Sequence, residues 1–337
     1  MNILITGGAG YIGSHTIIEL IGDGHDVVVV DNLSNSNQES LHRVEKITNT
    51  KIPFYKNDLR EIEALDKIFN ENSFDAVIHF AGLKSVGGSV KKPLEYYDNN
   101  INSTLSLLKI MQKHNVKKII FSSSATVYGV PSELPLMEKS QTGIGITNPY
   151  GQTKYMIEQI LHDLSFADNS FEITTLRYFN PVGAHSSGLI GEDPNGVPNN
   201  LLPYISQVAV EKLEKVNVYG NDYDTPDGTG VRDYIHVVDL AAGHVAALNK
   251  IKPGYQVFNL GTGHGTSVLE LISAFSKASG KNISYNISPR RPGDVATCYA
   301  SAKKANKELK WFAKKTINEA CSDSWLWQSQ NPNGYSS

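Results

Sequence analysis

The sequence predicts a doubly wound α/β fold, with a parallel β-sheet between two layers of helices and a smaller C-terminal domain. In the first half of the chain, short runs rich in Val and Ile alternate with longer amphipathic stretches. The runs are continuously apolar, which is typical of parallel strands that are buried on both faces. The second half differs, because stretches rich in Gly, Pro and Asn indicate loops and small elements that carry a site.

The expected strands and helices alternate along the chain. Buried strands are expected at Asn2–Thr6 (NILIT), Asp26–Asp31 (DVVVVD), Asp75–Phe80 (DAVIHF), Lys118–Ser122 (KIIFS) and Glu172–Leu176 (EITTL). Helices long enough to cross over between parallel strands are expected near Gly13–Gly22, Ile62–Asn70, Pro93–His114 and Tyr150–Phe166. Later elements are a helix near Leu202–Lys212, a helix at Val238–Asn249 and a strand at Gln256–Leu260. The last two indicate that the segment about 235–262 returns to the main sheet.

Composition excludes several classes of partner. The 337 residues suit one large or two modest domains, and 40% apolar residues suffice to bury a core. The formal net charge is −3 and there is no long basic block, so a nucleic acid is not expected as a partner. Two cysteines, Cys298 and Cys321, are too few for a disulfide framework, and the ten scattered histidines form no zinc pattern, so no metal is expected.

The chain also lacks the patterns of membrane insertion and secretion. No apolar run approaches the roughly 20 residues that a membrane span needs. In MNILITGGAG a glycine turn stands where a signal peptide would have its apolar segment. We therefore expect a cytoplasmic protein with no membrane partner.

A glycine-rich turn lies between the first strand and the first helix. In TGGAGYIG, Gly7, Gly10 and Gly13 allow a tight turn, close backbone approach to a pyrophosphate and close packing of helix on strand. The positive end of the helix then faces the pyrophosphate. Asp31 ends the second strand, where its carboxylate can accept both ribose hydroxyls and would repel the 2′-phosphate of NADP. The pattern predicts a site for NAD.

A second group of residues has the chemistry of an acid–base site. Tyr150 and Lys154 form a Y-x-x-x-K pair at the start of a helix, so both side chains lie on one face. An ammonium beside a phenol favours the phenolate and is expected to lower the pKa of Tyr150. This spacing also occurs on ordinary solvated helix faces. The serines Ser122 to Ser124 favour a site, because ligands of open α/β sheets bind where the strands end.

Motifs in the same order along the whole chain resemble one enzyme family. They are TGGAGYIG, Asp31-Asn32, HFAGLKSVGGSV, EYYDNN, SSSATVYG, NPYGQTK, RYFNPVGAH, GTGVRDYIHVVDLA, FNLGTG, RRPGD and WLWQSQNPNGY. Together they resemble the UDP-glucose (UDP-galactose) 4-epimerases of the extended short-chain dehydrogenase/reductase family. The resemblance runs from Met1 to Tyr335 and implies a Rossmann fold, NAD as cofactor and a UDP-sugar as substrate.

The resemblance also implies roles for single residues. Tyr150 would take the proton of the sugar 4-hydroxyl, Lys154 would bond the nicotinamide ribose and hold Tyr150 acidic, and Ser124 would bond the sugar oxygen that becomes a ketone. The positions that contact NAD in the family correspond to Gly7, Gly10, Tyr11, Ile12, Gly13, Asp31, Asn32, Asp58, Leu59, Phe80, Lys84, Asn99, Ser124, Tyr150, Lys154 and Phe179. Those that hold the UDP-sugar correspond to Asn180, Asn200, Leu201, Tyr219, Arg232, Arg291, Asp294 and Cys298. By itself Asp58, which follows another strand-like stretch in KNDL, is a plausible adenine contact, and an ordinary loop aspartate explains it nearly as well.

The implied reaction oxidises carbon 4 of the sugar, lets the keto-sugar present its other face, and reduces it again with the cofactor retained. A 4,6-dehydratase would start in the same way, but its Asp-Glu pair is replaced here by Ala125 and Thr126. A non-catalytic NAD-sensing protein would usually lose Tyr150 or Lys154, and both are present. A dehydrogenase that releases NADH remains an alternative, which spectroscopy would separate from an epimerase.

The residue type at Cys298 gives an expectation about which UDP-sugars the protein accepts. By itself a lone cysteine is commonly a small buried apolar residue. Family members with a bulky tyrosine at this position are restricted to UDP-glucose and UDP-galactose, whereas members with a small residue also admit N-acetylated sugars. The ungapped spacing from Asp294 places Cys298, and not Tyr299, at that position. We expect turnover of UDP-GlcNAc and UDP-GalNAc as well; the physiological pair and pathway stay open.

The organisation implied by the resemblance has two domains and two subunits. We expect a dinucleotide-binding domain over residues 1–179, joined by the segment about 235–262, and a UDP-sugar-binding domain over residues 180–337. The family forms homodimers through the helices at about Pro93–His114 and Tyr150–Phe166. The apolar residues of these helices are equally well explained by packing on the sheet.

Overall fold

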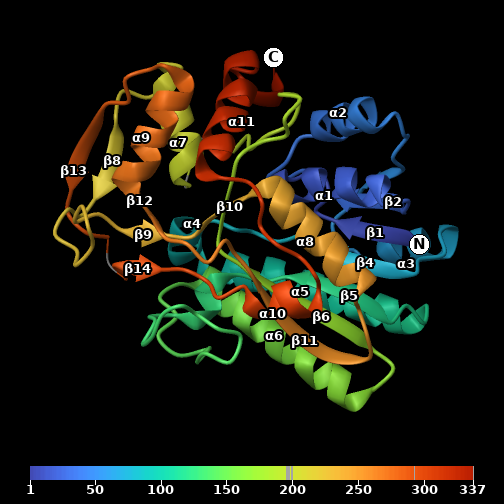
Figure 1. Cartoon of the computed structure of the whole chain (residues 1–337). Helices are drawn as coiled ribbons and strands as arrows, with labels where there is room; N and C mark the ends of the chain where they lie inside the picture. Colours follow the sequence, from blue (N-terminus) through green and yellow to red (C-terminus); the bar gives the residue numbers. More distant parts are fainter. Residues whose placement is uncertain (195–197, 199, 292, 337) are drawn as a thin grey trace.

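The computed structural model describes residues 1–194, 198, 200–291 and 293–336 (Figure 1). Its centre is a seven-stranded sheet in the order β11-β6-β5-β4-β1-β2-β3, with all neighbours parallel. The strands are β1 (Asn2–Thr6), β2 (Asp26–Asp31), β3 (Phe54–Lys56), β4 (Ala76–His79), β5 (Lys118–Ser122), β6 (Glu172–Tyr178) and β11 (Gly254–Leu260). The chain starts in the middle of the sheet and builds outward in both directions. This confirms the doubly wound α/β fold.

Helices cover both faces of the sheet because the strands are apolar on both sides. Ile3 and Ile5 of β1 belong to one hydrophobic core and Leu4 to another. The first core is closed by α1 (Tyr11–Gly22), α2 (Glu39–Thr48) and α8 (Val237–Asn249). The second is closed by α3 (Ile62–Glu71), α5 (Pro93–Lys113) and α6 (Pro149–Ala167). The continuous Val and Ile content of the strands thus reflects burial under two helical layers.

Smaller elements form a separate group beyond residue 180. They include β7 (Asn180–Val182) with β10 (Tyr234–His236), β8 (Val216–Tyr219) with β13 (Tyr285–Ser288), and β9 (Val231–Arg232) between β12 (Thr266–Ser267) and β14 (Thr297–Cys298). The helices α7 (Leu201–Ala209), α9 (Val268–Ser279) and α11 (Ile317–Gln330) share a third hydrophobic core. In Figure 1 these elements lie to one side of the seven-stranded sheet. Short elements complete the chain: α4 (Val86–Lys91), α10 (Lys303–Glu308), and the 3₁₀ turns η1 (Ala125–Tyr128) and η2 (Gly334–Ser336).

The structure differs from the expected elements mainly where sequence signals are short or polar. The helix α2 (ESLHRVEKIT) carries few apolar residues and was not expected, whereas the three-residue β3 lies at the strand-like stretch before Asp58. The expected helix at Leu202–Lys212 ends earlier, at Ala209. Within the part of the chain described, no helix is long and apolar enough to cross a bilayer.

A buried ion pair fixes α6 to the sheet. Arg177 of β6 donates to Glu158 of α6 through Nη2 at 2.6 Å and through Nε at 3.0 Å. Ser123 adds a hydrogen bond to the same carboxylate, and Arg177 also donates to the hydroxyl of Tyr128. Both charged side chains are almost fully buried, at 6% and 2% exposure. Each charge therefore depends on the other for its partner.

We expect Glu158→Ala to lower the free energy of unfolding by about 3–5 kcal/mol, because it leaves the Arg177 guanidinium buried without its counter-charge. Urea unfolding, followed by circular dichroism, measures the loss. Glu95→Ala is the matched control, because Glu95 pairs with Lys92 at 3.0 Å on the exposed surface. That change is expected to cost no more than about 1 kcal/mol. Equal losses for the two variants would show that the buried pair has no special role.

Candidate active site

A cavity of about 330 Å³ lies at the carboxyl edge of the parallel sheet. It is lined by residues that directly follow or end β1, β2, β4, β5 and β6, because parallel strands bring their carboxyl ends to one edge. The expected residues that line it are Gly7, Gly10, Tyr11, Ile12, Gly13, Asp31, Asn32, Asp58, Leu59, Phe80, Lys84, Asn99, Ser124, Tyr150, Lys154, Phe179, Asn180, Asn200 and Leu201. Residues expected for cofactor, catalysis and substrate thus share one cavity.

Five expected substrate residues lie outside that lining. They are Tyr219, Arg232, Arg291, Asp294 and Cys298, all of them described residues. They form a second group on β8, β9 and β14 and in the loop before β14. The guanidinium of Arg291 lies 3.8 Å from the centre of the Tyr219 ring, Arg232 Nη2 is 3.6 Å from Asp294 Oδ1, and Cys298 is the β-sheet partner of Arg232. The structure therefore divides the expected substrate residues into two groups.

The glycine turn leaves no room for side chains. A Cβ atom on Gly7, whose φ is +72°, would lie 2.7 Å from the backbone nitrogen of Ala81. A Cβ on Gly13 would lie 2.5 Å from the carbonyl oxygen of Gly7. The first turn of α1 begins at Tyr11, and its N-cap Gly10 provides no side-chain hydrogen bond. Backbone and helix end are therefore open to a phosphate group, as dinucleotide binding requires.

Asp31 is held firmly at the end of β2. Its carboxylate accepts hydrogen bonds from the backbone N–H of Ala9 at 3.1 Å and of Leu33 at 2.9 Å, and from the hydroxyl of Ser36 at 2.9 Å. Burial raises the pKa of Asp31, and these hydrogen bonds oppose that rise. A carboxylate has about four lone-pair positions, so capacity remains for a diol ligand. Together with the glycine turn, Asp31 fits the adenosine ribose of NAD.

Asp58 is a second fixed carboxylate in the cavity wall. It accepts a hydrogen bond from Asn32 Nδ2 at 3.0 Å and two from the Arg60 guanidinium at 3.0 and 2.9 Å. The bonds from Arg60 are the main reason that the pKa of Asp58 is lowered to about 2. The carboxylate is thus ionised and oriented, and its link with Asn32 joins the ends of two neighbouring strands.

The start of α6 carries the acid–base pair into the cavity. The helix begins at Pro149, and the side chain of its N-cap Asn148 accepts the backbone N–H of Gly151 at 2.8 Å. This places Tyr150 in the first turn and Lys154 one turn later. Residues four apart lie on the same helix face, so the pair faces the end of β5 together.

The electrostatics of this pair differ from the expectation. Burial raises the pKa of Tyr150 to about 12, although the hydrogen bond with Ser124 opposes the rise. Burial also lowers the pKa of Lys154 to about 8. The Lys154 ammonium donates to the carbonyl oxygen of Ser122 at 2.7 Å and lies 5.9 Å from the centre of the Tyr150 ring. The expectation that Lys154 lowers the pKa of Tyr150 is wrong for the protein alone, because loss of hydration of the phenolate outweighs the distant ammonium.

Some residues near the cavity were not expected from the sequence. Tyr178, the last residue of β6, lines the cavity and is hydrogen-bonded to the Ser122 hydroxyl. Its position beside Phe179 and Asn180 at a strand end could have identified it. Glu192 accepts hydrogen bonds from both Lys84 and Asn200. Nothing in the loop sequence GEDPNG distinguishes this glutamate. Among the described residues, no group of three or more His, Cys, Asp or Glu is suited to hold a metal ion.

Comparison with known proteins identifies the family. Residues 3–261 match the model of the NAD dependent epimerase/dehydratase family. The chain belongs to this family. It is 60% identical over 339 residues to the UDP-glucose 4-epimerase of Bacillus subtilis, covering 100% of this chain and 99% of that protein. It is 59% identical over 335 residues to the UDP-glucose 4-epimerase of Yersinia enterocolitica, covering 99% of each.

A solved structure of the same family has a similar fold. The UDP-glucose 4-epimerase of Bifidobacterium longum, crystallised with NAD⁺ and UDP, matches with a TM-score of 0.97 and 61% identity, covering 99% of this chain and 100% of that one. These findings confirm the resemblance to the UDP-glucose 4-epimerases of the extended short-chain dehydrogenase/reductase family. NAD is the cofactor of this family.

We expect Asp31→Ala to weaken retention of NAD, because the carboxylate that fits the ribose diol is removed. Activity of the purified variant should then depend on NAD added to the assay, whereas the unchanged protein should need little or none. The comparison is activity with and without added NAD after gel filtration. A variant that stays fully active without added NAD would contradict this role for Asp31.

Proposed function

We propose that this protein interconverts UDP-glucose and UDP-galactose through a transient 4-keto-sugar, with NAD held throughout. The observation that supports this most directly is that one cavity contains the glycine turn, Asp31 and the Ser124, Tyr150 and Lys154 side chains. When bound, NAD supplies a reversible two-electron oxidant for carbon 4 of the sugar and, in its oxidised form, a positive charge. The residues of the chain then have to bind the sugar nucleotide and move one proton.

Tyr150 is proposed as the group that moves this proton. Its phenol would take the proton of the 4-hydroxyl as carbon 4 is oxidised and return it when the ketone is reduced on its other face. In the protein alone the pKa of Tyr150 is raised to about 12, so the phenolate must be favoured before it can act as a base. Additional positive charge in the cavity favours the phenolate. The ammonium of Lys154 contributes to that positive charge as long as Lys154 is protonated.

Lys154 and Ser124 are proposed to orient the reacting groups. Lys154 is anchored by its 2.7 Å bond to the carbonyl of Ser122 and retains N–H donors for a ribose hydroxyl. Ser124 accepts the backbone N–H of Thr126 at 3.2 Å, and its own proton is shared with Tyr150 in the protein alone. That proton would be donated to the sugar oxygen once the substrate is bound. The neighbouring Ala125 and Thr126 provide no carboxyl group for a dehydratase reaction.

The sugar nucleotide is proposed to extend from this cavity toward the second group of residues. Asn180, Asn200 and Leu201 would contact it within the cavity. Arg232 and Arg291 would supply the bidentate cationic donors that suit a pyrophosphate. Tyr219 supports Arg291 through their ring contact, and Asp294 lies near Arg232. The other cavity residues that correspond to NAD-contacting positions of the family are proposed to contact NAD in this protein as well.

The small side chain of Cys298 is the reason to propose substrates beyond UDP-glucose and UDP-galactose. Its side chain packs against a hydrophobic cluster that contains Phe179 and Tyr128, and Ala125 packs against the same cluster. On the family likeness this position lies beside the sugar, where a small residue would leave room for an N-acetyl group. We infer that the protein also accepts UDP-GlcNAc and UDP-GalNAc.

The larger organisation is proposed from the same family likeness. We propose a dinucleotide-binding domain of residues 1–179 with the segment about 235–262, and a UDP-sugar-binding domain formed by the rest of 180–337. A homodimer through α5 and α6 is proposed on the family likeness alone. Both cysteines are free thiols, which is usual in a reducing compartment and supports a cytoplasmic location.

We expect Tyr150→Phe to remove most turnover while the protein still folds and binds NAD, because only the phenolic oxygen is lost. Acid–base catalysis contributes about 10²–10⁴-fold, so kcat should fall by at least that order. The measurement is conversion of UDP-galactose to UDP-glucose, with bound NAD and circular dichroism as controls. Near-normal turnover would contradict the proposed role of Tyr150.

We expect Cys298→Tyr to restrict the substrate range. Filling the space at this position costs roughly 1–3 kcal/mol, which corresponds to about 10–200-fold discrimination. kcat/KM for UDP-GlcNAc and UDP-GalNAc should fall by that order, with little change for UDP-galactose. A product assay with all four UDP-sugars gives the comparison. If the unchanged protein ignores UDP-GlcNAc, or if both substrate pairs lose equally, Cys298 does not control substrate size.

A further inference from the structure

A single carboxylate oxygen connects two side chains that belong to different parts of the cavity. Oε1 of Glu192 accepts a hydrogen bond from Lys84 Nζ at 3.1 Å and another from Asn200 Nδ2 at 2.9 Å. Lys84 comes from the loop after β4 and Asn200 from the N-cap of α7, and both line the main cavity. The carboxylate itself lies behind that wall, beside Tyr11, and its side chain is only 9% exposed.

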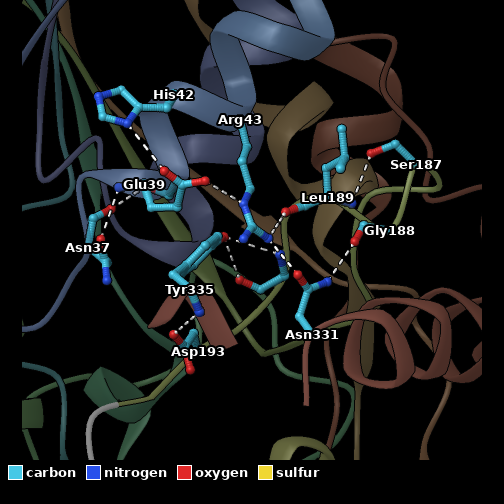
Figure 2. A network of polar contacts seen from close by, with 12 residues as sticks. Asn37, Glu39, His42, Arg43, Ser187, Gly188, Leu189, Asp193, Asn331 and Tyr335 are labelled. Atoms are coloured by element: carbon cyan, nitrogen blue, oxygen red, sulfur yellow. Dashed lines mark hydrogen bonds and ion pairs between the residues drawn. The ribbon is translucent and has the colours of Figure 1, made fainter. Parts of the chain in front are cut away.

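The backbone on both sides of Glu192 is held by the C-terminal part of the chain. The Tyr335 hydroxyl lies 3.3 Å from both the backbone N–H and the carbonyl of Gly191, so it can accept from one and donate to the other. The carboxylate of Asp193 accepts the backbone N–H of Tyr335 at 2.8 Å, as Figure 2 shows. Glu192 therefore projects from a segment that is fixed immediately before and after it.

A second set of contacts holds the same segment to α2. Arg43 donates to the carbonyl of Leu189 at 3.1 Å and to the side chain of Asn331 at 2.6 Å (Figure 2). Its guanidinium lies 5.1 Å from the centre of the Tyr335 ring, and Asn331 in turn donates to the carbonyl of Gly188 at 2.9 Å. Hydrogen bonds to the backbone of Gly188, Leu189 and Gly191 and to the Asp193 side chain thus limit the positions that the Glu192 carboxylate can take.

Glu192 leaves both of its partners able to bind a ligand. An ammonium has three N–H donors and a side-chain amide has two, so each partner uses only one of them on Glu192. Hydrogen bonds to a charged group are stronger and better directed than neutral ones. The lysine side chain is long and 46% exposed, so without this bond it would lose much of its preferred position.

We propose that Glu192 is a positioning residue that couples binding of the sugar nucleotide to retention of the dinucleotide. This rests on the proposed function, in which Lys84 contacts NAD and Asn200 contacts the UDP moiety. The fixed segment leaves the Glu192 side-chain torsions free, and a ligand that immobilises Asn200 limits these torsions and hence the freedom of Lys84. The second ligand then has less ordering left to do. Coupling of this kind is reciprocal between the two ligands and typically amounts to about 5–150-fold.

The test uses the NAD-loaded protein and UDP as the probe, and neither readout depends on turnover. Calorimetry gives the Kd of UDP, and the half-time of NAD loss during dialysis is measured with and without saturating UDP. In the unchanged protein UDP should lengthen that half-time by at least about fivefold. In Glu192→Ala the Kd of UDP should rise about tenfold and UDP should no longer affect NAD loss.

Two further variants separate positioning from general damage. Glu192→Gln keeps an acceptor oxygen for both donors and should restore both readouts to within about threefold of the unchanged protein. Glu45→Ala is the matched control, because Glu45 likewise accepts one lysine and one amide N–H, from Lys51 and Ile52, each at 2.9 Å. It should change neither readout.

Lys84→Met removes the hydrogen bond between Lys84 and Glu192 by changing the donor, and it should also abolish the effect of UDP on NAD loss. The inference is wrong if UDP still protects NAD in Glu192→Ala or Lys84→Met, if only the Kd of UDP changes, or if Glu192→Gln behaves like Glu192→Ala. It is also wrong if UDP binds the unchanged protein without affecting NAD loss, a result that leaves the proposed function intact. Failure of the unchanged protein to bind NAD or UDP would contradict the proposed function itself.

Discussion

The close approach of the glycine turn to the end of β4 is the constraint on which the cavity depends. Gly7 passes the backbone of Ala81 so closely that even a single Cβ atom would lie 2.7 Å away. Because Gly13 packs equally tightly on Gly7, α1 begins directly above β1 and points its free N–H groups at the cavity. A side chain at either position would separate helix from strand and remove the phosphate site. The proposed roles of Asp31, Asp58 and Lys84 depend on where these residues lie relative to this turn.

The acid–base pair depends on a second, electrostatic constraint. Tyr150 and Lys154 lie in the first turns of α6, and that helix is tied to β6 by the buried pair of Glu158 and Arg177. The same environment buries Lys154 and partly buries Tyr150. Burial raises the pKa of Tyr150 and lowers that of Lys154, so both charged forms are disfavoured in the protein alone. Further positive charge in the cavity would favour the phenolate, which is the form that the proposed role of Tyr150 requires.

The residues that are proposed to bind the substrate come from two parts of the chain. Asn180 and Asn200 line the cavity, whereas Arg232 lies on β9 and Arg291 in the loop before β14. Glu192 lies behind the cavity wall and contacts Lys84 from the cofactor side and Asn200 from the substrate side. Its position is set by residues as distant in sequence as Arg43 and Tyr335 (Figure 2). The C-terminal end of the chain therefore contributes to the site without entering it.

Local sequence by itself determined the sheet, the dinucleotide turn and the family. Continuous Val and Ile runs, glycines at a helix start and Asp31 at a strand end each express a requirement that acts within a few residues. Residues from distant segments met as expected at the carboxyl edge because parallel strands must end together. The polar helix α2 was missed, because its only apolar residues at helical spacing, Leu41, Val44 and Ile47, give a weak signal in the sequence. Only the tertiary structure decided the direction of the Tyr150 pKa and the role of Glu192. The first depends on burial and on contacts with Ser124 and Tyr96, and the second on a contact with Lys84, 108 residues away in the chain. No local pattern encodes these contacts.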